Sequence, residues 1–342
     1  MMSGSTAAQD ERISYSAFYP KTFLFSLFVA AYSHRRRSLQ LSGAVTANLI
    51  GYLTLANPNP IFGGALLSFF TLGTIATKYK QKIKAGLVDE SEQDCVPSDQ
   101  HHHHISKNDK TNKLQTGGPS PTPTGHPRPA GRDWKQVLCN AWFGTLCALS
   151  YAFFDPLSRH ELLLGSSYDN PFEIGPLRKA LVSASLAYWA GCAGDTFASE
   201  LGILSRSKPR LITNLKEVPA GTNGAVSILG LVFSALGGLL VGGVSSFVGE
   251  QHQSRRSMIV SCGIFGLFCS MVDSVLGATL QQTVYSKNER RVVAKSKVEL
   301  GGSREIVVIC GIDLLTNNQV NLISSTATGL LAGLLSCYSI IP

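Results

Sequence analysis

The sequence predicts an all-α fold, a polytopic membrane helical bundle of about eight transmembrane helices. The first observation is composition, because 44% of the residues are hydrophobic and 15% are charged, whereas a soluble globular chain carries about 25% charge. The second is a series of apolar runs, each close to the roughly 20 residues of a full span. These runs lie near residues 18–33, 41–56, 61–76, 136–155, 178–193, 225–248, 257–283 and 322–341.

The first element, residues 1–17, is expected to be a polar N-terminal tail. It carries Asp10 and Glu11, and the apolar run behind it has no small-residue cleavage pattern before Arg35. We therefore expect no cleavable signal peptide, and the first helix would remain as an anchor.

Residues 18–84 are expected to hold the N-terminal transmembrane helices. The runs at 41–56 and 61–76 are short, and the turn-forming sequence Asn57-Pro58-Asn59-Pro60 joins them. This joint predicts a helical hairpin. One broken helix is the alternative.

Residues 85–130 are predicted to form a disordered cytosolic insert. The segment contains the run His101–His104 and five prolines, Pro119, Pro121, Pro123, Pro127 and Pro129, and it cannot bury enough apolar surface to fold alone. Residues 131–342 would then form the main transmembrane domain, with cytosolic motif loops at 194–224 and 284–321.

The distribution of basic residues predicts the orientation, because lysine and arginine near helix ends stay in the cytosol. If the chain alternates sides, one face receives Arg35–Arg37 and the loops at 77–135, 194–224 and 284–321, which hold 23 of the 30 basic residues. We therefore place these segments in the cytosol and both termini on the other side. Arg255 and Arg256 are exceptions on the minority side.

The net charge of +8 is spread over these loops, as membrane topology requires, so we expect no nucleic-acid partner. Most of the eight cysteines lie in or beside apolar runs, and no CxxC spacing occurs. A zinc site or disulfide framework is therefore not expected.

Charged residues cluster after Gly194, between two apolar runs. Charged side chains are costly at a membrane boundary, so such a cluster suggests function. Asp195 and Glu200 could hold one cation jointly, and Asp273, inside the run at 257–283, would supply a third carboxylate. Oxygen ligands of this kind suit Mg²⁺, which usually binds one or two carboxylates together with substrate phosphates. We therefore name Asp195, Glu200 and Asp273 as candidate metal ligands.

A glycine-rich turn, residues 218–227, runs directly into the next apolar helix. Glycines allow close backbone approach, and a helix N-terminus attracts anions, so the turn could cradle a phosphate. The candidate substrate-binding residues are Gly221, Thr222, Gly224, Ser227 and Asn321, and the candidate catalytic residues, three cations and one orienting amide, are Lys208, Arg210, Lys216 and Asn223. An ordinary loop, with its cations setting topology or contacting anionic lipid, is the alternative.

Asp273, Gly277 and Gln281 fall on one helical face, at i, i+4 and i+8. Close helix packing through small residues, as in Gly194-xxx-Ala198-xxx-Gly202, would explain such a stripe without function. A carboxylate in the stripe favours a functional interpretation.

These residues also carry a resemblance to a known family. The string Gly194-Asp195-Thr196-Phe197-Ala198-Ser199-Glu200-Leu201-Gly202 and the string from Pro219 to Ser227 resemble the signature of the transmembrane protein 19 family. Further matches lie at Ser38-Leu39, Gly43-Ala44, Thr77-Lys78, from Arg132 to Asn140, at Asp273-Ser274, Gly277-Ala278-Thr279 and Val320-Asn321.

The resemblance covers nearly the whole chain except the insert. That family includes plant and cyanobacterial phytyl-phosphate kinases, so the resemblance implies phosphoryl transfer from a nucleoside triphosphate to an isoprenyl monophosphate. It makes Mg²⁺ and the nucleotide the expected cofactors, and the lipid bilayer and the isoprenyl monophosphate the expected partners. The expected location is an endomembrane such as the endoplasmic reticulum.

Two other functions stay open. A transporter or lipid-flipping protein would spread polar residues towards the bilayer midplane and show internal repeats. A non-catalytic scaffold would use the small residues for packing.

Overall fold

The computed structural model describes residues 19–93, 131–154, 175–249, 255–288, 290–293, 305–339 and 341. The expectations for residues 1–17, for His101–His104 and for the insert beyond Gln93 lie outside these residues. Within residues 85–130 the structure places the end of helix α3, which extends to Gln93, so helix begins the segment that we expected to be disordered throughout.

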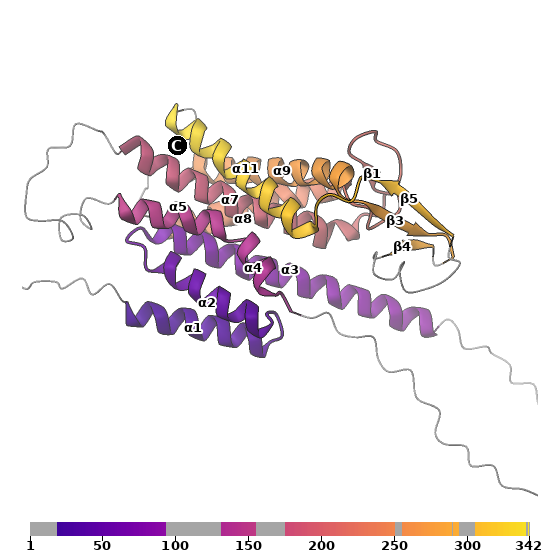
Figure 1. The fold of residues 1–342 in the computed structure, drawn as a ribbon, viewed down its shortest axis with the longest axis horizontal. Helices are drawn as coiled ribbons and strands as arrows, with labels where there is room; N and C mark the ends of the chain where they lie inside the picture. Colours follow the sequence, from indigo (N-terminus) through magenta and orange to yellow (C-terminus); the bar gives the residue numbers. More distant parts are fainter. Residues whose placement is uncertain are drawn as a thin grey trace, which may run out of the picture.

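Helices dominate the described chain, and each predicted apolar run overlaps at least one of them (Figure 1). The run predicted at 136–155 is divided between two helices, α4 and α5. They are α1 (Pro20–Arg35), α2 (Leu41–Leu55), α3 (Pro60–Gln93), α4 (Trp134–Cys139), α5 (Trp142–Phe153), α7 (Gly175–Leu201), α8 (Ile228–Val248), α9 (Arg255–Leu280) and α11 (Asn317–Cys337), with a 3₁₀ turn η1 (Gly202–Leu204).

Four of these helices are long and apolar enough to cross a membrane: Pro60–Tyr79 of α3, and α8, α9 and α11. Helices α2 and α5 are apolar but shorter. The structure therefore supports a multi-pass membrane protein, and the count of eight spans stays a prediction.

The prediction of an all-α fold is wrong in the loops at one end of the bundle. Strands β1 (Arg210–Leu211) and β2 (Ala225–Val226) pair antiparallel, and β3 (Thr283–Ser286) lies between β4 (Arg291–Val293) and β5 (Ile306–Cys310) in an antiparallel sheet. The strands of this sheet are rich in β-branched residues, but they are too short to register as apolar runs.

The joint at Asn57–Pro60 is a hairpin turn, as predicted. The Asn57 side-chain oxygen accepts a hydrogen bond from the Asn59 amide (2.9 Å), and the Asn59 side chain accepts one from Ile61 (3.1 Å). The Asn57 side-chain nitrogen donates to the Ala148 carbonyl in α5 at 2.6 Å. These bonds satisfy polar groups of the turn. Because α2 ends at Leu55 and α3 begins at Pro60, the two runs are separate helices and not one broken helix.

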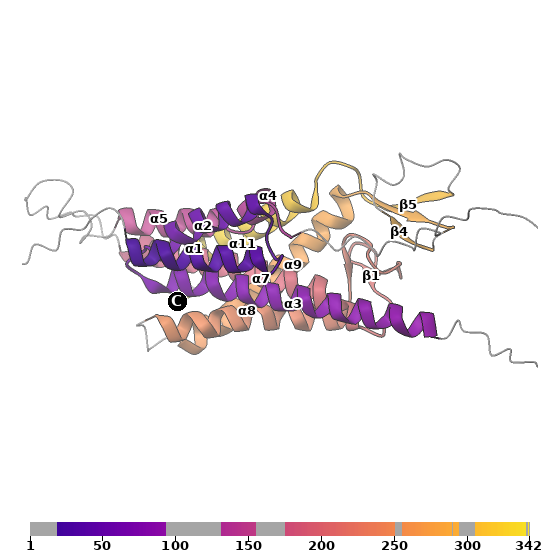
Figure 2. The ribbon, with the colours of Figure 1, turned by 90° about the horizontal axis from the view of Figure 1, so that it is seen from below.

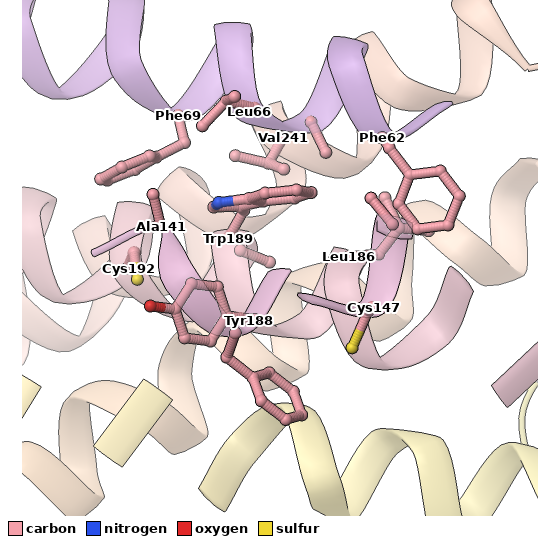
Figure 3. Close-up of a cluster of buried hydrophobic side chains, with 14 of the residues drawn as sticks. Phe62, Leu66, Phe69, Ala141, Cys147, Leu186, Tyr188, Trp189, Cys192 and Val241 are labelled. Carbon is pink, nitrogen blue, oxygen red and sulfur yellow. The ribbon is translucent and has the colours of Figure 1, made fainter. Parts of the chain in front are cut away.

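The core surrounds the middle of α7 (Figure 3). Trp189 and Tyr188 are fully buried. Phe69, Leu66 and Val241 lie around the Trp189 ring, and the Tyr188 hydroxyl donates to the Cys139 carbonyl at 2.7 Å. Large aromatic side chains thus fix α7 against α3, α5 and α8.

The basic loops gather at one end of the bundle, as the topology prediction requires. In both views the turn after α1, the strands and the last turns of α3 lie towards the same end of the bundle, opposite the hairpin between α2 and α3, and α3 and the strands extend beyond the turn after α1 (Figures 1 and 2). This basic end therefore contains the described parts of the four segments that we assigned to one face.

Candidate functional site

Asp195 and Glu200 both lie on α7, which continues to Leu201. The segment expected to form a loop over 194–224 is therefore helical in its first part. Gly194 does not end the helix. It lies where α8 and α9 approach so closely that a Cβ would lie 2.6 Å from the Gly266 carbonyl oxygen, so only glycine fits there. Asp195 is consequently held at a three-helix crossing.

Asp195 lies close enough to Asp273 of α9 for the two carboxylates to interact electrostatically. Asp273 has fixed partners on α11. The Ser324 hydroxyl donates to Asp273 Oδ2 at 3.2 Å, and the Asn321 amide, in the orientation that satisfies its neighbours, donates through its nitrogen to the same oxygen at 3.1 Å. The structure thus brings together three residues of the prediction: Asp195, Asp273 and Asn321.

Glu200 points towards α3 instead. The Thr77 hydroxyl donates to the Gly73 carbonyl at 2.9 Å and also lies 3.5 Å from Glu200 Oε1, and Arg132 Nη2 donates to that hydroxyl at 3.4 Å. Glu200 still contributes negative potential at Asp195. In the described part of the chain, no three His, Cys, Asp or Glu side chains are grouped to hold a metal ion. A joint metal site of Asp195, Glu200 and Asp273 stays a prediction.

Arg132 is a functional candidate that we did not name from the sequence. Its backbone pairs with the turn after α1, since its amide donates to the Ser38 carbonyl (3.0 Å) and its carbonyl accepts from Gln40 (2.9 Å). Burial lowers the pKa of its guanidinium, and the Glu200 carboxylate partly offsets this shift. Only its place in the family resemblance distinguishes it from the other basic residues in the sequence.

The glycine-rich turn packs on α9 beside Asp273. Gly224 has a φ of +72°, and a Cβ there would overlap the Ser274 carbonyl oxygen. The Asn223 amide donates to the Thr283 hydroxyl at 3.1 Å. The Thr222 amide and hydroxyl both donate to the Pro219 carbonyl, so several donors that a phosphate cradle would use are already engaged.

Ser227 is the N-cap of α8, where its hydroxyl accepts from the Gly230 amide at 3.1 Å. Such a cap satisfies a backbone donor that would otherwise be unpaired. The helix end is therefore ordered by its own sequence, and phosphate binding by Ser227 would have to replace this bond.

The predicted cations lie on the surface of the same end. Lys208 and Arg210 both pair with Glu217, at 3.7 and 3.4 Å, and all three side chains are more than half exposed. Lys216 is exposed beside them. Because these side chains are exposed, the cations are accessible to a charged ligand. Their pairs with Glu217 contribute little to stability, so little would be lost if a ligand replaced them.

Comparison with known proteins also indicates an integral membrane protein. Residues 24–329 match the family described as "Integral membrane protein DUF92". The chain is 28% identical over 323 residues to Protein PGR of Arabidopsis thaliana, covering 92% of this chain and 95% of the relative.

An archaeal relative matches a shorter part. The uncharacterized membrane protein MJ0933 of Methanocaldococcus jannaschii is 35% identical over 122 residues, which is 35% of this chain and 48% of the relative. No solved structure matches.

The expected resemblance thus holds at the level of an integral membrane protein family, and membership of the transmembrane protein 19 family stays a prediction. The match covers most of the chain, including Asp195, Asp273, Arg132 and the glycine-rich turn. The chain therefore belongs to the DUF92 family of integral membrane proteins.

Proposed function

We propose that this chain is a membrane phosphotransferase that moves the terminal phosphoryl group of a nucleoside triphosphate to an isoprenyl, phytyl-like, monophosphate. The observation that carries the proposal is that Asp195 and Asp273 lie within electrostatic range of each other near the basic end of the bundle, with Ser324 and Asn321 beside the second carboxylate. Carboxylates inside apolar helices are costly and commonly mark functional sites.

Mg²⁺ fits this pair, because it usually takes one or two carboxylates and completes its shell with water and substrate phosphates. Asp195 and Asp273 would hold the ion, and when bound it would neutralise charge on the nucleotide phosphates. Glu200, the third expected ligand, would instead orient Arg132 through Thr77.

The reaction requires little covalent chemistry from the protein. A phosphate oxygen of the lipid would attack the terminal phosphorus of the nucleotide in line, and the bond to the departing nucleoside diphosphate would break. An ionised phosphate is already a nucleophile, so no histidine is needed as a general base. Positioning and charge neutralisation would supply most of the rate.

The remaining candidates would act on phosphates. Lys208, Arg210 and Lys216 would neutralise charge on the nucleotide from the exposed loop, and Asn223 and Asn321 would orient it. The turn would contact phosphate through the backbone near Gly221 and Gly224, since Thr222 and Ser227 already have internal partners.

A non-enzymatic role in lipid handling, transport or scaffolding is the second candidate. The observation that favours it is the close packing of glycines between α7, α8 and α9, where small residues alone explain part of the motif. Under that function Asp195 and Asp273 would serve only helix association. An endomembrane location, such as the endoplasmic reticulum, suits either function.

The deciding experiment supplies the detergent-purified full chain with Mg²⁺, a nucleoside triphosphate, and phytyl or geranylgeranyl monophosphate. We expect lipid diphosphate from the wild type and from Glu305→Gln, a control whose carboxylate pairs only with exposed Lys287 among the contacts described. We expect none from Asp195→Asn or Asp273→Asn. Folded wild type that forms no diphosphate with any nucleotide tested would favour the non-enzymatic function.

A further inference from the structure

The glycine-rich turn lies against one face of the sheet formed by β4, β3 and β5. The Asn223 amide donates to the Thr283 hydroxyl on β3 at 3.1 Å, and the Cys310 thiol on β5 donates to the Asn223 carbonyl at 3.5 Å. A Cβ on Gly221 would lie 3.9 Å from Val292 Cβ on β4. The turn therefore lies beside all three strands.

A row of three side chains crosses the same face of the sheet. Tyr285 on β3 pairs with Val292 on β4 and with Val307 on β5, and residues directly opposite each other in an antiparallel sheet project from one face. Thr283, two residues before Tyr285, projects from that face as well, because side chains alternate along a strand. The glycine-rich turn and this row, which we call the Tyr285 row, therefore share one face.

The fold leaves the Tyr285 row partly open. Val307 is 42% exposed, and Tyr285 and Val292 are partly buried. Neighbouring strands lie about 4.8 Å apart, so the row extends for about 10 Å from β4 to β5. It presents an aromatic ring between two aliphatic side chains, which is an apolar surface that suits a planar ligand.

The glycine-rich turn also connects this row to the helix that carries Asp273. A Cβ on Gly224 would overlap the Ser274 carbonyl oxygen, and Ser274 follows Asp273 on α9. Gly221, beside the row, is three residues from Gly224, which is at most about 11 Å of extended chain. A ligand that lay along the turn would therefore reach from the Tyr285 row to the backbone next to Asp273.

We propose that the Tyr285 row binds the base of the nucleoside triphosphate, with Tyr285 stacked on the base and the triphosphate along the glycine-rich turn. The inference rests on the proposed function and assigns the base site of its nucleotide. Aromatic side chains on open sheets stack nucleobases, because every base has a flat π face. The exposed cations Lys208, Arg210 and Lys216 at the same end complement the charge of the triphosphate.

The test is calorimetric titration of the detergent-purified full chain with adenosine, guanosine, cytidine and uridine triphosphates in turn. Mg²⁺ is present and lipid substrate is left out, so the result does not depend on phosphoryl transfer. Tyr285→Ala should weaken binding of the preferred nucleotide about tenfold, and Tyr285→Phe, which keeps the ring, should retain most of the affinity. The matched control is Tyr338→Ala, which removes a 77% exposed ring after α11 and should bind like the wild type. Wild-type affinity in folded Tyr285→Ala would overturn the proposal.

Inorganic tripolyphosphate separates the base from the phosphates. It carries no base, so the wild type and Tyr285→Ala should bind it equally, whereas nucleotide binding should differ about tenfold between them. An equal loss for tripolyphosphate and nucleotide would mean that Tyr285 supports the sheet instead of stacking on the base, and would overturn the proposal.

The transfer assay distinguishes failure of this inference from failure of the proposed function. Lipid diphosphate formed by Tyr285→Ala with the wild-type KM for nucleotide would leave the proposed function standing and remove the base site alone. Folded wild type that neither binds any of the four nucleotides nor forms diphosphate would remove both.

Discussion

Gly194 of α7 contacts Gly266 of α9 so closely that a Cβ on Gly194 would lie 2.6 Å from the Gly266 carbonyl oxygen and 2.7 Å from that of Ser234 in α8. This contact fixes the spacing of the two helices that carry Asp195 and Asp273. The packing interpretation of the Gly194-xxx-Ala198-xxx-Gly202 stripe and the functional interpretation are therefore connected, since the glycine seam positions the carboxylates.

The first prediction concerns this seam. Gly194→Val should push α7 away from α9, destabilise the chain by about 2 kcal/mol, and abolish phosphoryl transfer because Asp195 moves away from Asp273. The measurements are thermal unfolding in detergent and the transfer assay. The matched control is Gly243→Val on α8, where a Cβ meets nothing within 4 Å. Equal effects of the two substitutions would contradict a special role for Gly194.

The second prediction separates metal binding from catalysis. Removing one of two close carboxylates relieves like-charge repulsion, so Asp195→Asn should melt no earlier than wild type while losing transfer activity. Mg²⁺ should raise the melting temperature of the wild type, because an ion that binds only the folded state stabilises it. The same Mg²⁺ should leave Asp195→Asn unchanged. Glu305→Gln should respond like wild type, and a metal shift that survives in Asp195→Asn would place the ion elsewhere.

The third prediction concerns the hydroxyl between Arg132 and Glu200. Thr77→Val keeps the shape of the side chain but leaves both charges without this partner, which should destabilise the chain by about 1–3 kcal/mol. Thr46→Val on α2, whose hydroxyl bonds within its own helix, is the control.

A double-mutant cycle of Thr77→Val with Arg132→Gln tests whether the two residues act together. Their effects on transfer should be non-additive, as expected for residues in one hydrogen-bond network. Strict additivity would show that Thr77 and Arg132 act independently.

The fourth prediction uses two glycines of the turn that share a left-handed backbone. Gly221 (φ +88°) is exposed, and the nearest atom to an added Cβ is Val292 Cβ at 3.9 Å, whereas a Cβ on Gly224 (φ +72°) would overlap Ser274. Gly221→Ala should therefore destabilise the fold by about 1 kcal/mol, and Gly224→Ala by more. If the turn contacts nucleotide phosphate, Gly221→Ala should also weaken nucleotide binding, and unchanged binding would count against this contact.

The helices could be predicted from the sequence because long apolar runs have few alternatives in a membrane. The sheet could not, since Thr283–Ser286, Arg291–Val293 and Ile306–Cys310 are short and lie in loops where charge dominates the average. The end of α7 was also missed. Polar residues after Gly194 suggested a loop, but tertiary contacts with α8 and α9 stabilise the helix to Leu201.

The candidate site was likewise predicted only in part from the sequence. Asp195 and Asp273 could be named because a carboxylate inside an apolar run is unusual in itself. Their meeting depends on contacts between helices far apart in the chain, which local spacing cannot predict. Arg132 was not named as a candidate because its position depends on backbone pairing with Ser38 and Gln40. These residues are far from Arg132 in the chain, and the sequence around Arg132 does not predict the pairing.

The last prediction tests the membrane orientation of the basic end. Three apolar helices, α8, α9 and α11, separate Ser207 from Cys337, and each is long enough to span. Three crossings place these two positions on opposite sides, and the positive-inside rule puts Ser207 in the cytosol. In sealed vesicles with the cytosolic face outward, an impermeant thiol reagent should label Ser207→Cys at once and Cys337 only after permeabilisation, as followed by peptide mass spectrometry. Labelling of both from outside would mean that one of the three helices does not cross, and Cys337 would then lie on the same side of the membrane as Ser207, against the orientation we predict.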